Sequence, residues 1–301
     1  MDLKQINRAV EGYLPQADEA DAARLRFFKG LFELQQRRAD ELEAVAAYEP
    51  APGDQLDRAY LAGTAAFTAA PVVVAARDLA ATCAQVAAEL AAHAGLADQA
   101  AFALREADWD ELLSGADLGL AGSDPVAFVT DVVARRGELG VPTALTDDLL
   151  AMALAFSLRP HLQGPAARVM GAVSDDAKSG SHSRPLDCPV CGSPAALSRV
   201  GEVDTLHGGA RIQYCATCGT SWPFERIRCG SCGSRSQEGI HHFHVDGDEA
   251  HRLETCEGCG QYQRVVFAND LQVPLALEVE DVVMAKLDRI ALDPRFSARG
   301  E

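Results

Sequence analysis

The sequence is short of positive charge. Its 301 residues contain 27 lysines and arginines against 44 aspartates and glutamates, so the formal net charge is -17 at pH 7. A surface of this sign repels the phosphate backbone, and the composition therefore disfavours a nucleic-acid partner. The same surface is compatible with a basic segment or a basic pocket on a partner protein.

The sequence also has no long, strongly apolar run. Residues 59–76 carry no charge over 18 positions, but they are mostly alanine and include Gly63 and Pro71. We expect a buried helix followed by a break there, not a membrane span. Residues 1–10 show neither the basic start nor the apolar core of a secretory signal. We therefore expect no membrane insertion and a cytoplasmic location.

Several catalytic signatures are missing. The sequence contains no phosphate-binding loop, no Gly-x-Ser-x-Gly and no His-Glu-x-x-His. We predict that the protein is not an enzyme and that it has no catalytic residues.

The amino-acid composition changes near residue 175 and divides the chain into two parts. Before this point alanine and leucine dominate, and the helical spacing of apolar residues predicts roughly six or seven helices. We expect helices over residues 22–47, over 72–94, from Pro125 onward behind Ser123 and Asp124, and from Thr146 to about Leu158. Pro160 is expected to end the last of these. Cys83, the one cysteine of this part, is expected to be a small buried hydrophobe.

After residue 175 the pattern changes to polar turns and short β-like runs. Strands are expected at residues 211–214, 241–245 and 263–267, and a closing helix at 277–290. The predicted fold class is α+β, with an all-α N-terminal domain, tandem β-rich rubredoxin-like or zinc-ribbon units and a C-terminal helix. The expected segments are a helical domain (1–175), a linker (176–187), a first four-cysteine unit (188–228), a second one (229–270), and a C-terminal helix with tail (271–301).

The remaining eight cysteines form an internal repeat. They are Cys188, Cys191, Cys215 and Cys218, followed at a constant offset of 41 by Cys229, Cys232, Cys256 and Cys259. A fixed period of this length marks a duplicated structural unit. Duplication copies a unit that already folds, so we expect each group of four to form its own site. The alternative grouping joins Cys215 and Cys218 to Cys229 and Cys232 across a ten-residue gap.

This spacing suits metal binding. Zinc or iron takes four thiolates in a tetrahedron with metal–sulfur bonds of ~2.3 Å, and a Cys-x-x-Cys turn aims both sulfurs at one ion. A glycine follows each pair, namely Gly192, Gly219, Gly233 and Gly260. We expect positive φ at these glycines, with the N–H near a sulfur. Redox disulfides are the disfavoured alternative, because no βαβ context surrounds the pairs.

The cysteine segments resemble the formate dehydrogenase accessory proteins, FdhE. The resemblance is carried by Cys188-Pro-Val-Cys-Gly-Ser, Tyr214-Cys-Ala-Thr-Cys-Gly-Thr-Ser-Trp222, Arg228-Cys-Gly-Ser-Cys-Gly, Glu254-Thr-Cys-Glu-Gly-Cys-Gly and residues 274–289. Specific matching covers about the last third of the chain. Gly230 stands where proline is typical in the knuckle, which is a small departure.

The resemblance implies a cytoplasmic accessory protein for a molybdenum- or tungsten-dependent formate dehydrogenase. It implies contact with the catalytic subunit of that enzyme or of a related molybdopterin oxidoreductase. It also implies rubredoxin-like sites associated with iron, with zinc as the alternative. A rubredoxin-like electron carrier or redox sensor is the competing function. A nucleic-acid zinc ribbon is disfavoured by the charge, and a DnaJ-type zinc chaperone by the lack of Cys-x-x-Cys-x-Gly-x-Gly.

Three histidines lie on one expected strand. His242 and His244 are expected to share a face, with Phe243 on the other. A third metal site is possible there, but each ion already has four thiolates, so a solvated strand face is favoured. Trp222 is expected to pack over the metal unit.

Overall fold

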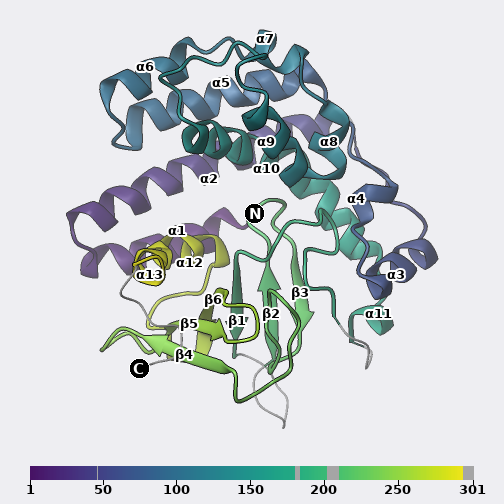
Figure 1. Cartoon of the computed structure of the whole chain (residues 1–301), viewed down its shortest axis with the longest axis vertical. Coiled ribbons are helices and arrows are strands. Elements are labelled where there is room, and N and C mark those ends of the chain that lie inside the picture. The colour runs from purple at the N-terminus through teal and green to yellow at the C-terminus, as the bar shows by residue number, and fades with distance from the viewer. Residues whose placement is uncertain (46, 180–183, 202–209, 294–301) are drawn as a thin grey trace.

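Helices and sheet occupy separate parts of the molecule. The computed structural model describes residues 1–45, 47–179, 184–201 and 210–293. Helices of the first part form a thick upper layer, and the sheet of the cysteine-rich part lies beneath them (Figure 1). Helices from near the end of the chain lie between the sheet and the first helices. The α+β fold class predicted from the sequence is confirmed.

The first part contains more helices than the sequence predicts, because several are short. They are α1 (Leu3–Tyr13), the 3-10 helix η1 (Leu14–Gln16), α2 (Glu19–Val45), α3 (Gly53–Ala62), α4 (Ala66–Ala69), α5 (Ala76–His93), α6 (Asp98–Glu106), α7 (Trp109–Ser114), α8 (Leu118–Ser123), α9 (Pro125–Ala134) and α10 (Asp147–Ala172). The start signals are confirmed at two places. Asp124 caps α9 by accepting from the Ala127 N–H at 3.0 Å, and Thr146 caps α10.

The predicted end of α10 is wrong. The helix continues through Pro160 and Pro165 to Ala172. Pro160 has no N–H to donate to the carbonyl of Phe156, one turn earlier. The side chain of Gln35 on α2 replaces it, with Nε2 donating to Phe156 O at 2.8 Å. A tertiary contact therefore stabilises a helix that the local sequence would end.

The start of α5 also differs from the expectation of a helix from residue 72. The chain is extended before Ala76, and the Val72 N–H donates to Gly122 O at 3.0 Å. The two backbones approach so closely that a Cβ on Gly122 would lie 1.8 Å from Val72 O. Glycine at position 122 is therefore required for this packing.

The cysteine-rich part forms one six-stranded sheet. Its strands are β1 (Leu197–Val200), β2 (Arg211–Tyr214), β3 (Ser221–Phe224), β4 (Ile240–His244), β5 (His251–Cys256) and β6 (Tyr262–Phe267), in the order β3-β2-β1-β6-β5-β4. Each repeat contributes an antiparallel group of three, and β1 pairs with β6 in parallel. The first strand of the first repeat thus pairs with the last strand of the second repeat.

The end of the described chain holds two helices where the sequence predicts one. They are α12 (Leu277–Val283) and α13 (Ala285–Ala291), separated at Met284. Apolar residues of α12 pack against α1 and α2 in a separate small core that includes Ile6, Val10, Phe32, Val279 and Val282. This contact ties the two parts of the chain together.

The segment expected to be an irregular linker is partly helical. Helix α11 covers Asp175–Ser179, and its Ala177 N–H donates to Ser174 Oγ at 3.1 Å. Residues 180–183 of the expected linker lie outside the described residues. None of the helices in the described ranges is long and apolar enough to cross a membrane.

Candidate metal centres

All four Cys-x-x-Cys-Gly segments adopt the same knuckle. In each, the first cysteine donates its N–H to the carbonyl five residues on, and the glycine donates its N–H back to the carbonyl of the first cysteine. The first set of bonds joins Cys188 to Ser193, Cys215 to Thr220, Cys229 to Ser234, and Cys256 to Gln261, at 2.8–3.0 Å. Two hydrogen bonds per turn hold each pair of sulfurs on the same side of the chain.

The glycine that ends each knuckle needs a left-handed backbone. Its φ is 77° at Gly192, 78° at Gly219, 75° at Gly233 and 68° at Gly260. The expectation of positive φ is confirmed. The glycine N–H, which was expected near a sulfur, donates to the first cysteine's carbonyl at 2.8–3.0 Å. In the third knuckle the donors to Cys229 Sγ are the N–H groups of Ser231 and Cys232.

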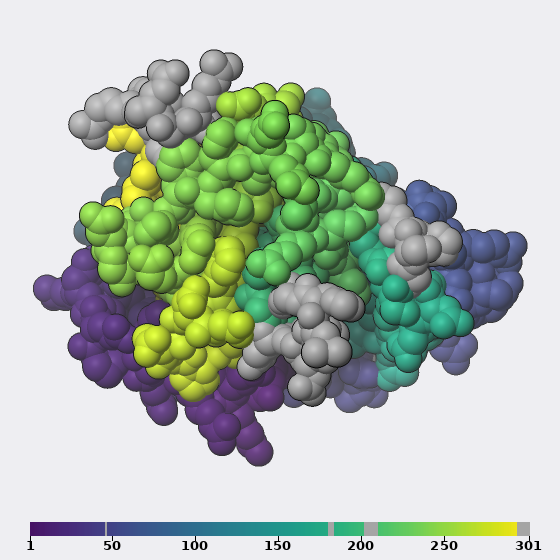
Figure 2. All heavy atoms as spheres, turned by 90° about the horizontal axis from the view of Figure 1, so that it is seen from below, coloured from purple at the N-terminus to yellow at the C-terminus, as the bar shows by residue number. Residues whose placement is uncertain are grey.

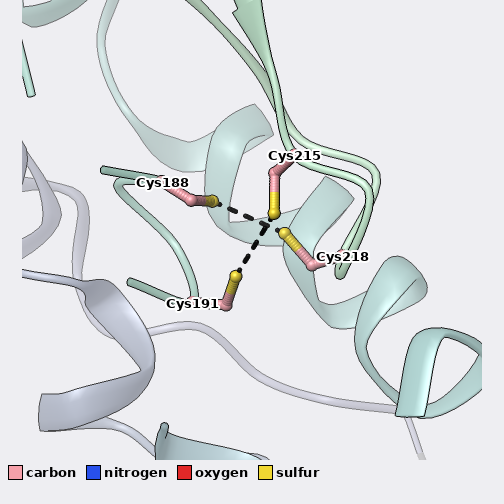
Figure 3. Close-up of side chains that lie close together, drawn as sticks. All are labelled: Cys188, Cys191, Cys215 and Cys218. Atoms are coloured by element: carbon pink, nitrogen blue, oxygen red, sulfur yellow. Dashed lines mark hydrogen bonds between the residues drawn. The ribbon is translucent and has the colours of Figure 1, made fainter. Parts of the chain in front are cut away.

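The eight cysteines gather into two clusters, in the grouping that the repeat predicts. Site one contains Cys188, Cys191, Cys215 and Cys218, and site two contains Cys229, Cys232, Cys256 and Cys259. In site one the four sulfurs point toward a common centre (Figure 3). Within each cluster the ligand atoms lie within 4.8 Å of one another.

The sulfur separations match a tetrahedral ion. They are 3.5 and 3.6 Å between pairs in site one, and 3.8 Å in both measured pairs of site two. A tetrahedron with metal–sulfur bonds of ~2.3 Å has edges of about 3.8 Å. In site one, two sulfurs also contact side-chain hydroxyls. Cys191 Sγ lies 3.3 Å from Ser193 Oγ, and Cys218 Sγ lies 3.1 Å from Thr220 Oγ1. Both clusters could hold a zinc or iron ion.

Burial makes site one unsuited to free thiolates. Loss of solvation raises the pKa of the Cys188 and Cys218 thiols well above the ordinary value, whereas hydrogen bonds from the neighbouring thiols lower the pKa of Cys215, so the cluster stabilises one negative sulfur but not four. A bound cation replaces these protons and removes the cost of burying negative sulfur. The donor set therefore fits a thiophilic metal better than four packed thiols.

Site one is part of the main hydrophobic core. Its cysteines and Trp222 share one cluster of buried side chains with residues of the helical part. Backbone N–H groups at the start of α4 hold the knuckle, with Ala66 donating to Pro189 O and Phe67 to Val190 O, both at 2.9 Å. Trp222 packs in this core, as expected, and its Nε1–H donates to Pro185 O at 3.0 Å.

Site two lies at the surface. Cys232 is exposed and Cys259 is half-buried, whereas Cys229 and Cys256 are buried. The second repeat, light green, forms the front of the molecule in Figure 2, away from the helical layer. The two sites have the same ligands but different surroundings.

The other residues considered in the sequence take structural roles. Cys83 is fully buried in α5, and burial raises its pKa to about 12, so it behaves as an apolar side chain. On β4, His241 contacts Glu257 at 3.1 Å and His244 contacts Glu249 at 3.2 Å. Within the described ranges the histidines form no third cluster of metal-ligating groups.

A buried charged cluster was not expected from the sequence. His251 on β5 lies between two carboxylates, with Nδ1 2.6 Å from Asp248 Oδ1 and Nε2 2.8 Å from Glu280 Oε2. Burial opposes protonation, but the hydrogen bonds to both carboxylates prevail and raise the pKa of His251 to about 9. Tyr13 donates to Glu280 at 2.8 Å. Asp248 and His251 are close in sequence, so their spacing could have suggested a contact. Glu280 and Tyr13 are distant in sequence, and no local pattern connects them to His251.

Comparison with known proteins supports the resemblance seen in the sequence. Residues 187–226 match the family described as FdhE, central domain. A protein FdhE homolog from Aquifex aeolicus is 28% identical over 156 residues, which cover 50% of this chain and 50% of the relative. Protein FdhE from Escherichia coli is 31% identical over 117 residues, covering 38% of this chain and 34% of the relative. The chain thus spans about half, or less, of the length of these curated relatives.

A solved structure has the same fold over the whole chain. The crystal structure of the FdhE protein from Pseudomonas aeruginosa matches with a TM-score of 0.55 and 19% identity, covering 99% of this chain and 94% of that one. At this identity the likeness shows the fold alone. Together with the sequence matches, it confirms the resemblance to the FdhE family.

Proposed function

We propose that this chain, a relative of the FdhE family, is an accessory protein that is needed for the activity of a molybdenum- or tungsten-dependent formate dehydrogenase. The observation that carries the proposal is the match of residues 187–226, which contain the first two knuckles, to the FdhE central domain, together with the similarity of the chain to a curated FdhE homologue. The protein acts on another protein and is not itself an enzyme. Its place of action is the cytoplasm, where such an enzyme is assembled.

The eight knuckle cysteines would hold two metal ions, one in each site. A bound ion supplies four strong bonds that fix the two knuckles of a repeat against each other. Four thiolates close each site and leave no position for a reacting water, so the ions would support structure or electron transfer. Iron is favoured by the family resemblance, and zinc is the alternative.

The partner would be the catalytic subunit of the formate dehydrogenase or of a related molybdopterin oxidoreductase. The net charge of -17 favours a basic segment or pocket on that partner. Such a contact would form quickly at low salt and weaken as salt increases, because exposed charges are screened.

Deletion of the gene tests this proposal. We expect formate dehydrogenase activity to fall while the amount of catalytic subunit stays the same. The wild-type gene should restore the activity, and a gene with Cys188→Ser and Cys191→Ser should not. Undiminished formate dehydrogenase activity in the deletion strain would contradict the proposal. If the absorption spectrum of the purified protein then changed reversibly on reduction and oxidation, with a measurable reduction potential, the electron-carrier alternative would be favoured.

A further inference from the structure

The duplicated metal sites differ in how much of each ligand set solvent can reach. In site one all four cysteines are at most 1% exposed. In site two Cys229 and Cys256 are 5% and 4% exposed, Cys259 is half-buried and Cys232 is exposed. Cys232 is the repeat counterpart of Cys191. The corresponding cysteine is therefore buried in the first repeat and exposed to solvent in the second.

The difference arises from what covers each knuckle. The first knuckle is held by the N–H groups of Ala66 and Phe67 at the start of α4, which donate to Pro189 O and Val190 O. In the third knuckle, Ser231 beside Cys232 is exposed.

One cavity does reach the first site. It has a volume of about 210 Å³ and borders Cys218, Gly219 and Thr220. Its wall contains the buried ion pair of Arg159 with Glu278, at 2.9 Å. Cys218 itself is 1% exposed, so its sulfur is shielded in spite of the cavity. An incoming ligand would have to displace packed groups to reach this ion.

We propose that site two is an exchange site, which takes up and releases its ion through the solvent-exposed ligand Cys232, whereas site one, inside the core, releases its ion much more slowly. This inference rests on the proposed binding of two ions. The acceptor or donor is a thiol-bearing or chelating molecule that can approach the exposed face of the third and fourth knuckles. Thiophilic ions are the cargo that such a ligand set selects.

The exchange step is a ligand substitution without electron transfer. An incoming thiol loses its proton and its sulfur forms a bond to the ion. The bond from the ion to Cys232 Sγ breaks, and that sulfur takes up the proton. Cys259 can follow by the same step, because it is half-buried. The charge of the ion and its oxidation state do not change.

Metal release from the full chain tests the proposal. The protein with two ions bound is mixed with excess EDTA, and the ion remaining on the protein is measured by metal analysis after rapid desalting. We expect two phases of equal size, with the fast one at least about tenfold faster, which corresponds to ~1.4 kcal/mol or more in barrier height. Brief treatment with iodoacetamide and peptide mapping should label Cys232 first and leave Cys191 unlabelled.

A matched pair of variants assigns the phases. Cys232→Ser should remove or accelerate the fast phase and leave the slow one unchanged. Ala66→Pro removes the N–H that donates to Pro189 O, at the first position of α4, where proline is tolerated. It should accelerate the slow phase alone. Two ions released at one common rate, or equal labelling of Cys191 and Cys232, would overturn the exchange proposal and leave metal binding intact. A protein without bound ions would instead contradict the proposed function.

Discussion

Arg211 on β2 and Glu254 on β5 form a buried ion pair that joins the two repeats. Two parallel contacts connect them, Nη1 to Oε2 at 3.1 Å and Nη2 to Oε1 at 3.0 Å. The side chains are 1% and 7% exposed. In the duplication, Arg211 corresponds to Arg252 and Glu254 corresponds to Gln213, so each repeat supplies one partner. The pair makes the sheet one structure with two metal sites.

Removal of Arg211 should therefore be costly. Arg211→Met leaves the Glu254 carboxylate buried and unpaired, and we expect a loss of about 3–5 kcal/mol in the free energy of unfolding. Arg211→Met combined with Glu254→Leu should recover much of this loss. The control is Arg252→Met at the corresponding, more exposed position, which should cost about 1 kcal/mol. Urea unfolding of the metal-loaded wild type and of the three variants measures these costs. Equal losses at positions 211 and 252 would contradict a linking role.

A side chain at position 230 should disturb the second site, because it would meet the amide of Gln263, which Arg211 restrains. A Cβ at this position would lie 2.1 Å from Gln263 Oε1, which accepts from Arg211 at 2.5 Å. Gly230→Ala should weaken ion binding at site two, and adding Gln263→Ala should restore it. Gly258→Ala is the control, because its nearest neighbour would be 3.6 Å away and Thr217 occupies the corresponding position of the first repeat. Metal analysis should show about one ion per chain for Gly230→Ala alone. Normal metal content would contradict this prediction.

The His251 cluster should make stability depend on pH. The pKa of His251 is raised from the ordinary value of 6.5 to about 9 in the folded protein. Its contribution is therefore complete below pH 6.5 and is lost as pH rises through 9. The shift corresponds to about 3 kcal/mol. His251→Gln should cost more at pH 6 than at pH 9.5, as measured by urea unfolding.

A second histidine provides a control for the substitution itself. His244 on the edge strand β4 contacts Glu249 at 3.2 Å near the surface. His244→Gln should cost little, because an ion pair near the surface contributes little to stability. If the cost of His251→Gln did not change with pH, the carboxylates of Asp248 and Glu280 would not stabilise a charged imidazole there.

The contact of Gln35 with α10 should depend on Pro160. Gln35→Leu leaves Phe156 O without its donor, which we expect to cost about 1–3 kcal/mol. Pro160→Ala restores a backbone N–H that can donate to the same carbonyl. In that background Gln35→Leu should cost at least about 1 kcal/mol less. Urea unfolding of the four proteins gives the coupling energy, and strict additivity would show that the side chain does not replace the missing N–H.

The sequence predicts the knuckles well because their chemistry is local. A fixed offset of 41 residues pairs the cysteines, and the structure brings together the same two groups. Positive φ at the four glycines follows from the turn itself. The strands β1, β3 and β5 were not predicted, because their apolar residues do not stand out from the polar turns around them. Segment boundaries of the domains stay predictions.

Long-range contacts explain the other differences. The length of α10 depends on Gln35, more than 100 residues away from Phe156. Nothing near Cys188 shows that α4 would cover the first knuckle and leave the third one open. The partner of His251 in α12 is equally remote in sequence. These features arise from tertiary packing, which periodicity and spacing do not encode.

The most direct test of two separate metal sites is the metal content of the gently purified chain and of one variant. We expect near two ions of iron or zinc per chain, and near one after the paired change Cys229→Ser and Cys232→Ser, because site one has its own four ligands in the core of the protein. Mass-spectrometric metal analysis against protein concentration gives both values. One ion or none in the wild-type protein, or loss of both ions from the variant, would contradict the account.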